Sequence, residues 1–237
     1  MEIIVFPNAE TVAARAAVII AELSGDAIKK RGQFTFAVSG GTTPWLMLNH
    51  LAKLDIAWDK IHIFQVDERV APSGDRSRNW THLSETLLSQ VKLPEAQTHG
   101  IPVNMTDLEA AAAHYSATLC SVAGTPAVLD LVHLGLGADG HTASLVPNDK
   151  VLSVHDADVA VTAFYQNQRR VTLTYPLIDR ARHILWVVVG ADKQCALKML
   201  LHGDRSIPAG RVNGERATVL ADSAAIGSAD VVGAFGP

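Results

Sequence analysis

Residues 130–147 read DLVHLGLGADGHTASLVP, and this stretch decides how the rest of the chain is interpreted. An apolar run, which we expect to form a buried strand, passes directly into a turn with three glycines. Glycine adopts positive φ and lets a ligand approach the backbone, so such turns at strand ends are typical binding sites. The turn carries Asp139, His141, Thr142 and Ser144. A structural turn with a solvated histidine is one interpretation. We favour an active-site floor, with His141 as a general base near neutral pH.

On both sides of this stretch, short runs rich in Val, Ile and Leu alternate with Ala-rich helical segments. Near-continuous apolar runs are typical of strands that are buried on both faces of a parallel sheet. The pattern therefore predicts an α/β fold with an open, mostly parallel sheet flanked by helices. Strands are expected near Ile3–Phe6, Phe34–Val38, Lys60–Val66, Leu129–Leu134, Val159–Phe164, Val171–Thr174, Ile184–Val189 and Thr218–Leu220. Helices are expected near Ala9–Lys30, Pro44–Leu54, Asn79–Val91, Leu108–Val122, Pro176–Arg180 and Lys193–His202.

Length and composition limit the class of function. A chain of 237 residues can bury a substantial core, and we expect one domain over residues 1–237. The net charge of −4 argues against a nucleic-acid binder and favours a small-molecule ligand. Cys120 and Cys195 form no CxxC pair, so neither a disulfide nor a thiolate zinc site is expected. The ten histidines show no HExxH spacing, so no metal site is predicted.

The N-terminal sequence MEIIVFPNAE has no basic segment followed by an apolar one, so we expect a chain that is not exported. The longest apolar stretch, Thr11–Leu23, is interrupted by Arg15 and Glu22, and a membrane span needs roughly 20 apolar residues. We expect a cytoplasmic protein with no membrane role and no obligate protein partner. Segments rich in Gly, Pro and polar residues, among them Gly227–Pro237, are expected to be surface loops.

The predicted strand Phe34–Val38 is followed by SGGTTP at residues 39–44. Thr43 is suited to cap a helix and Pro44 to occupy its first position. Two glycines before them expose backbone N–H groups that can receive a phosphate at a helix N-terminus. A structural strand-to-helix turn is equally compatible with this motif, and the GK[ST] ending of a Walker A loop is absent. The phosphate-binding interpretation assigns Gly40, Gly41, Thr42 and Thr43, with Ser39 beside them.

The strand over Lys60–Val66 leads into the acids Asp67 and Glu68 and then Arg69. Such a group is either a catalytic cluster or a solvated rim, and its position at a strand end favours the cluster. Arg69 can offer its planar fork to a developing carboxylate or to phosphate. We expect the two acids to hold that fork in place, and we expect Arg76 and Arg78 at the surface.

Two further cations follow or open predicted strands. Arg170 opens the strand VTLT, and Lys193 begins a helix after ILWVVVG. Either one alone is typical of a protein surface. If their loops meet the 39–44 turn, they would add positive charge to a phosphate pocket, where Arg makes bidentate contacts and Lys acts as a point charge.

Two other enzyme classes have partial signatures. Gly135, Gly137 and Gly140 satisfy the dinucleotide-binding pattern GxGxxG, but Pro147 interrupts the helix that this fingerprint should open. The serines that follow strands lack the GxSxG context of a nucleophile elbow, which argues against a serine hydrolase.

The ordered set SGGTTP, VDERV with a downstream Asn79, GLGADGHTASLVP, RVTLTYPLI and VVGADK resembles the 6-phosphogluconolactonases over nearly the whole chain. VDER and GxDGHTASL are the most specific pieces. Glucosamine-6-phosphate deaminases of the same fold share the SGG and DGH turns but typically continue as Ile-Ala-Phe-Asn-Glu-Pro. Here Thr142–Pro147 reads TASLVP, so the deaminase glutamate is missing and the lactonase is favoured.

The resemblance implies a Rossmann-like fold of the NagB/ribose-5-phosphate isomerase-like type. It also implies hydrolysis of 6-phospho-D-glucono-1,5-lactone to 6-phospho-D-gluconate in the oxidative pentose phosphate pathway, without metal or organic cofactor. In that chemistry His141 would deprotonate the attacking water, Asp139 would orient the imidazole, and Arg69 would stabilise charge on the carbonyl. The 39–44 amides, with Arg170 and Lys193, would hold the phosphate. Ser39, Asp67, Glu68, Asn79 and Thr142 complete the predicted pocket.

Two rival functions stay open on the sequence. One is an aldose–ketose isomerase or deaminase of amino sugar phosphates, which ammonia release would identify. The other is a sugar-phosphate sensor, which would bind without turnover. A pure sensor has no need of a general base beside its ligand, and no DNA-binding segment is evident in the sequence.

Overall fold

Seven parallel strands form the main sheet of the computed structural model, which describes residues 1–227. The spatial order is β1-β10-β9-β6-β2-β3-β5. The strands are β1 (Glu2–Phe6), β2 (Phe34–Val38), β3 (Ile61–Gln65), β5 (Thr98–His99), β6 (Leu131–Leu134), β9 (Ile184–Val188) and β10 (Ala217–Asp222). The helices are α1 (Ala9–Arg31), α2 (Thr42–Leu51), α3 (Asn79–Leu83), α4 (Leu108–Ala123), α5 (Tyr175–Arg180), α6 (Gln194–Leu201) and α7 (Ser223–Ile226).

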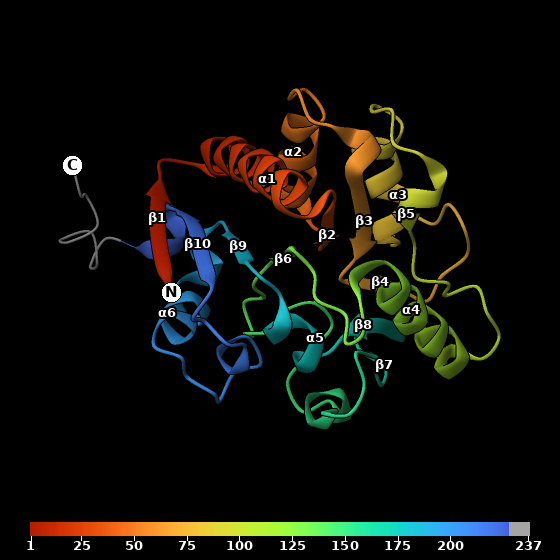
Figure 1. The fold of residues 1–237 in the computed structure, drawn as a ribbon. Coiled ribbons are helices and arrows are strands. Elements are labelled where there is room, and N and C mark those ends of the chain that lie inside the picture. The colour runs from red at the N-terminus through yellow and green to blue at the C-terminus, as the bar shows by residue number, and fades with distance from the viewer. Residues whose placement is uncertain (228–237) are drawn as a thin grey trace.

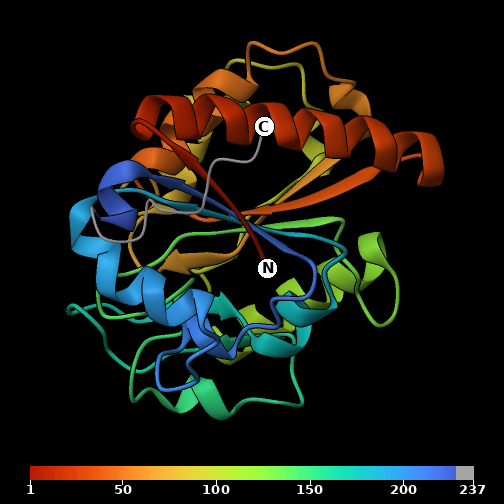
Figure 2. The ribbon, with the colours of Figure 1, turned by 90° about the vertical axis from the view of Figure 1, so that its left-hand side faces the viewer.

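Helices cover both faces of this sheet. Figures 1 and 2 show α1 and α2 on one face and α4, α5 and α6 on the other. Successive side chains of a strand point to opposite faces, so a strand between two helical layers supplies both cores. In β9, Leu185 and Val187 join the core under α1, whereas Trp186 and Val188 join the core on the other face. The apolar runs of the sequence are therefore explained by burial on both sides.

A second sheet has three antiparallel strands, in the order β4-β8-β7. They are β4 (Asp67–Arg69), β7 (Val159–Val161) and β8 (Arg170–Leu173), and Arg69 pairs with Arg170 across the ladder. Val66 connects the sheets, because its N–H donates to the Val38 carbonyl and its own carbonyl accepts from Leu173 N–H. The chain thus passes from β3 in the main sheet into β4 in the small one within a few residues.

Several predicted boundaries differ from the structure. The expected helix Asn79–Val91 is α3 followed by a π-helical turn over Ser84–Leu88, and β7 ends at Val161 instead of Phe164. Strands β4 and β5 were not predicted, because each has at most three residues and offers no apolar run. The single domain stays a prediction, and positions 228–237 of the loop expected at Gly227–Pro237 lie outside the described residues. Within residues 1–227, no helix combines the length and the apolar character needed to cross a membrane.

The topology changes direction between β2 and β6, which are neighbours in the sheet. From β2 the chain builds outward to β3 and β5, and from β6 it builds the other way to β9 and β10. In open α/β sheets ligands bind in the crevice at such a switch point, beyond the carboxyl ends of the strands. Strand β2 ends directly before the 39–44 turn, and β6 ends directly before Gly135. The two glycine turns of the sequence therefore meet at one crevice.

Candidate active site

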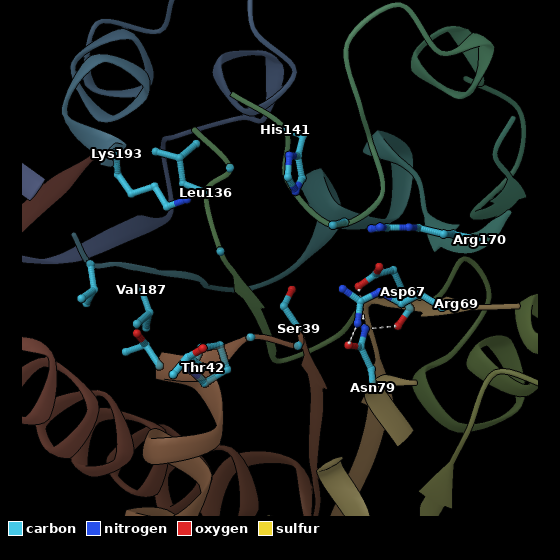
Figure 3. A pocket seen from close by; sticks show the side chains of 18 residues that line it. Ser39, Thr42, Asp67, Arg69, Asn79, Leu136, His141, Arg170, Val187 and Lys193 are labelled. Atoms are coloured by element: carbon cyan, nitrogen blue, oxygen red, sulfur yellow. Dashed lines mark hydrogen bonds between the residues drawn. The ribbon is translucent and has the colours of Figure 1, made fainter. Parts of the chain in front are cut away.

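A cavity of about 330 Å³ occupies this crevice. Its walls come from segments far apart in the sequence: the 39–44 turn, the β4 strand with the start of α3, the turn after β6, β8, and the segment after β9 (Figure 3). Of the residues predicted from the sequence, the following line the cavity: Ser39, Gly40, Gly41, Thr42, Thr43, Asp67, Arg69, Asn79, His141, Arg170 and Lys193.

The 39–44 turn leads into α2 without a side-chain cap. The helix begins at Thr42, one residue before the expected cap Thr43, and its N-cap is Gly41 with φ of 134°. Among residues 1–227, no side-chain cap hydrogen bond is present at this N-terminus. The prediction that Thr43 caps the helix was therefore wrong, because the left-handed glycine turns the chain into the helix earlier. Uncapped N–H groups in a first turn form a suitable site for an anion.

A buried histidine that the sequence analysis missed is hydrogen-bonded to the first residue of this turn. His133 lies on β6 with no exposed surface, and its Nδ1 accepts the Ser39 N–H at 3.3 Å. The Ser39 hydroxyl in turn donates to the His133 carbonyl at 3.0 Å. Burial lowers the pKa of His133 to about 3, so the ring is neutral at physiological pH and Nδ1 can accept. A lone histidine in the apolar run LVHL gave no sign of this role.

The turn after β6 brings Asp139 and His141 into direct contact. Asp139 Oδ1 accepts from the His141 backbone N–H at 3.1 Å and lies 2.5 Å from its Nδ1. A Cβ at Gly137 would overlap His141 Nδ1 and Asp139 Oδ1, so a larger residue there would displace this pair. Because an ionised carboxylate only accepts hydrogen bonds, the contact selects the neutral tautomer with its proton on Nδ1 and its lone pair on Nε2. Nε2 is thus the atom able to accept a proton.

The pKa of Asp139 keeps this carboxylate ionised. Partial burial alone would raise that pKa, but the hydrogen bonds from His141 and Tyr165 outweigh burial and hold it below its usual range. Thr142, also predicted for the pocket, is buried and donates to the Gly135 carbonyl at 2.9 Å. Thr142 therefore stabilises the turn through this hydrogen bond and does not line the cavity.

Tyr165 is a site residue that no sequence motif indicated. Its hydroxyl donates to Asp139 Oδ2 at 3.1 Å, and its ring meets the His141 ring edge-on with centroids 5.8 Å apart. It lies in the connection between β7 and β8, far from the DGH turn in sequence. The only available signal was its place between two predicted strands, which does not specify what the turn touches.

The Arg69 guanidinium is held by the loop before α3 and by Asn79, the first residue of α3, and not by the neighbouring carboxylates. Its Nη1 donates to the Ser77 carbonyl at 2.9 Å and to Asn79 Oδ1 at 2.6 Å. Asn79 Nδ2 donates to Asp67, at 2.9 Å to the carbonyl and 3.2 Å to Oδ1. The expectation that Asp67 and Glu68 grip the guanidinium was wrong, since no hydrogen bond joins them within the described residues. The Asn79 side-chain amide instead connects Arg69 with Asp67. This position of Asn79 requires glycine at position 40, because a Cβ there would overlap the amide.

Glu68 is fully buried and organises the loop that holds Arg69. Its two oxygens accept backbone N–H groups from Arg69, Asn79 and Trp80, each at 2.8 Å, and the Gln65 side chain at 2.9 Å. Arg78 Nε approaches it at 3.4 Å. The expectation that Arg78 lies at the surface was wrong, because a buried carboxylate needs a nearby cation and several donors. Arg76 is exposed, as predicted.

Asp67 and Arg170 are linked by a buried serine. Ser144 Oγ donates to Asp67 Oδ2 at 2.6 Å, and Arg170 Nη1 lies 3.5 Å from the same Oγ. Burial lowers the pKa of Arg170, although the Asp67 charge opposes the shift. Within residues 1–227, the buried Nε atoms of Arg69 and Arg170 have no hydrogen-bond partner. Two partly desolvated guanidinium groups therefore lie at one end of the cavity.

Figure 3 separates the cations of the site into two groups. Lys193 lies across from Thr42, at the end of the cavity formed by α2. Arg170 lies at the other end with Asp67 and Arg69. His141 lies between the two groups, on the wall that faces Ser39. Lys193 belongs to a short 3₁₀ turn, Ala191–Lys193, before α6, and its Nζ pairs with Asp192 at 2.9 Å.

This arrangement is a cationic crevice at the switch point of a parallel sheet, with His141 on its wall and Asp139 in contact with that histidine. It defines an α/β protein built to take a small anionic ligand. The sequence model of the family glucosamine-6-phosphate isomerases/6-phosphogluconolactonase matches residues 7–221. The chain belongs to this family, which confirms the resemblance of its motifs.

Relatives and solved structures agree with this assignment. The 6-phosphogluconolactonase of Synechocystis sp. is 40% identical over 194 residues, covering 80% of each chain. That of Mycobacterium bovis is 34% identical, covering 91% of this chain and 92% of the relative. The Thermotoga maritima 6-phosphogluconolactonase structure is 25% identical, with a TM-score of 0.83 over 93% of this chain and 98% of that one. A monomeric glucosamine-6-phosphate deaminase, 20% identical, has a TM-score of 0.82 over 95% and 98% of the two chains, which shows the shared fold alone.

Proposed function

We propose that this protein hydrolyses 6-phospho-D-glucono-1,5-lactone to 6-phospho-D-gluconate, a step of the oxidative pentose phosphate pathway. The proposal rests first on the family and on the 40% identical 6-phosphogluconolactonase relative. The single structural observation that carries it is the 2.5 Å contact between Asp139 Oδ1 and His141 Nδ1. This contact leaves Nε2 of His141 as a proton acceptor on the wall of a cationic cavity.

Hydrolysis of a lactone needs a nucleophilic water and a route for one proton. His141 Nε2 removes a proton from water as the oxygen attacks the lactone carbonyl. The tetrahedral intermediate then collapses, the bond between the carbonyl carbon and the ring oxygen breaks, and the imidazolium returns the proton to that oxygen. Asp139 stays ionised throughout and stabilises the imidazolium. No covalent enzyme intermediate is needed.

The guanidinium pair is placed to stabilise the negative charge that develops on the carbonyl oxygen. Donors that are fixed before the reaction cost no reorganisation during it. Arg69 is fixed by Ser77 and Asn79, and Arg170 is 95% buried. Arg170 was expected at the phosphate, but its place beside Asp67 in Figure 3 leads us to assign it to the lactone end.

The opposite end of the cavity is assigned to the phosphate of the substrate. The uncapped N-terminus of α2 supplies backbone N–H groups, and Lys193 supplies a point charge across from them. Binding energy from a phosphate remote from the reacting carbonyl fixes that carbonyl near the water. The two ends thus divide binding and chemistry between them.

The chain lacks the glutamate that is typical of the deaminases. Between Thr142 and Pro147 there is no glutamate, and Val146, directly before the proline, is buried and apolar. The sensor alternative leaves the Asp139–His141 contact without a purpose. Neither alternative is favoured by a further observation.

The decisive assay follows 6-phosphogluconolactone, generated in place from glucose 6-phosphate, with and without protein. The lactone also hydrolyses in water, so the expected result is decay faster than this background. Decay at the background rate, with ammonia released from glucosamine 6-phosphate, would replace the lactonase by a deaminase. Binding of sugar phosphate with no turnover of either compound would identify a sensor.

A further inference from the structure

The turn between β7 and β8 contacts the Asp139–His141 pair through Tyr165. We propose that Tyr165, on this turn, is a positioning residue for lactone hydrolysis: its hydroxyl fixes the carboxylate that orients the His141 imidazole. This role rests on the proposed function of the same site. It adds a third member, from a distant part of the chain, to the pair on the DGH turn.

The carboxylate of Asp139 is held from two directions. Its Oδ1 takes both hydrogen bonds from His141, at 3.1 Å from the backbone N–H and 2.5 Å from Nδ1. Its Oδ2 takes the Tyr165 hydroxyl at 3.1 Å. The Asp139 side chain is 40% exposed, so packing alone does not fix its rotamer. With Oδ2 bonded, the carboxylate cannot rotate to solvent without losing the tyrosine hydrogen bond.

Tyr165 is itself placed by a tight hairpin. Tyr165 and Gln168 exchange backbone hydrogen bonds at 3.0 and 3.2 Å, and Gln166 and Asn167 between them have φ of 50° and 63°. Two positive φ angles in a two-residue loop are the geometry of a type I′ turn, which suits the twist of antiparallel strands. At its base, Ala163 N–H donates to Asp149 Oδ2 at 3.0 Å. The hairpin is therefore anchored and not a free loop.

Further contacts join the hairpin to the rest of the site. Gln168 Nε2 donates to Ser77 Oγ at 3.1 Å, beside the carbonyl that holds Arg69. Arg170 lies over the Tyr165 ring, with its guanidinium carbon 5.1 Å from the ring centroid. A cation above an aromatic face is attracted to it and limits the freedom of the ring. The ring thus sits between Arg170 and the edge of His141.

The hydroxyl keeps its proton over the working range of pH. Burial and the hydrogen bond to Asp139 raise the pKa of Tyr165 above its usual value. The group is therefore a permanent donor, and Asp139 is its acceptor.

The variant Tyr165→Phe tests this role, because phenylalanine keeps the ring between Arg170 and His141 and removes only the donor. We expect kcat to fall about tenfold, in the range for loss of a hydrogen bond to a charged group at a partly exposed site, with KM within about twofold of wild type. The matched control is Phe164→Ala on the same turn, because Phe164 is 76% exposed. Circular dichroism and thermal unfolding confirm that each variant is folded.

A double-mutant cycle with Asp139→Ala tests whether Tyr165 acts through the carboxylate. If it does, Tyr165→Phe has no further effect on the residual rate of Asp139→Ala, measured at high enzyme concentration. Wild-type kcat in Tyr165→Phe overturns the role, and so does a full additional loss in the Asp139→Ala background. Wild-type protein without lactonase activity would instead overturn the proposed function, and with it this role.

Discussion

The two ends of the cavity are built in different ways. At the ends of the parallel strands the site is built on glycine turns: the 39–44 turn presents backbone N–H groups at the α2 end, and the turn after β6 places the Asp139–His141 pair between the two ends. Beside the small antiparallel sheet, the site consists of charged side chains held by a buried hydrogen-bonded network around Glu68 and Asp67. The first construction depends on a few local residues, whereas the second depends on partners far apart in the sequence. Substitutions should therefore act differently at the two ends.

The largest expected effect lies in the buried network. Glu68→Ala leaves four hydrogen-bond donors and the Arg78 charge without their acceptor, so the free energy of unfolding should fall by about 3–5 kcal/mol. The matched control is Glu85→Ala, whose partner Arg76 is exposed, and it should lose at most about 1 kcal/mol. Urea unfolding of both variants makes the measurement. Equal losses of unfolding free energy in the two variants would show that the buried network contributes no more to stability than an exposed ion pair.

The backbone-built turn is tested by adding a single carbon. Gly137→Ala should lower kcat roughly a hundredfold, because its Cβ would displace His141 and Asp139 from their contact. Gly25→Ala, in α1 and outside the cavity, meets no atom within 4 Å and should keep wild-type kcat. If the lactonase assay shows the same kcat for both variants, the claim that the turn requires close approach fails.

Acid should destabilise the support of the 39–44 turn. The pKa of His133 is lowered by burial to about 3 in the folded protein and is about 6.5 in an unfolded chain. The unfolded state therefore takes up a proton first as the pH falls below about 6.5, and stability is lost from there toward pH 3. Between pH 8 and 5 this loss amounts to about 2 kcal/mol.

The variant His133→Gln keeps an acceptor for Ser39 N–H and removes this titration. Urea titrations at pH 8 and pH 5 give the free energy of unfolding of both proteins. Between these pH values the variant should lose about 2 kcal/mol less than the wild type. The other histidines titrate in both proteins and cancel in the comparison. An identical pH dependence would mean that His133 is not the buried neutral base described above.

The smallest expected effect lies at the phosphate end. Lys193→Met should raise KM about tenfold with little change in kcat, since the lysine contacts a remote phosphate and not the reacting carbonyl. Lys198→Met, on the exposed side of α6, should leave both constants unchanged. A fall in kcat with constant KM would move Lys193 from the binding end to the reacting end.

Much of the fold could be predicted from the sequence, because apolar runs are local signals, whereas the predicted Thr43 cap was wrong. Except for the two-residue β5, the parallel strands were predicted from apolar runs that are buried on both faces. The Asp139–His141 turn was found because its glycines and polar residues are consecutive. Strand β4 was missed, because three polar residues look like a loop until β8 pairs with them.

The contacts within the site are where local signals fail. The buried position of Arg78 follows from the burial of Glu68, ten residues away, which no pattern of charges reveals. Tyr165 contacts Asp139 only because the β7–β8 hairpin folds over the DGH turn. In both cases the decisive partner comes from another element, so the fold had to be known first.

The most direct test of His141 as the general base is the rate of 6-phosphogluconolactone decay with wild-type protein, His141→Ala and His155→Ala. His155 is an exposed histidine outside the cavity. We expect wild type and His155→Ala to accelerate decay equally and His141→Ala to be slower by about 10²–10⁴-fold. Wild-type acceleration by a folded His141→Ala variant would contradict the assignment of His141 as the base.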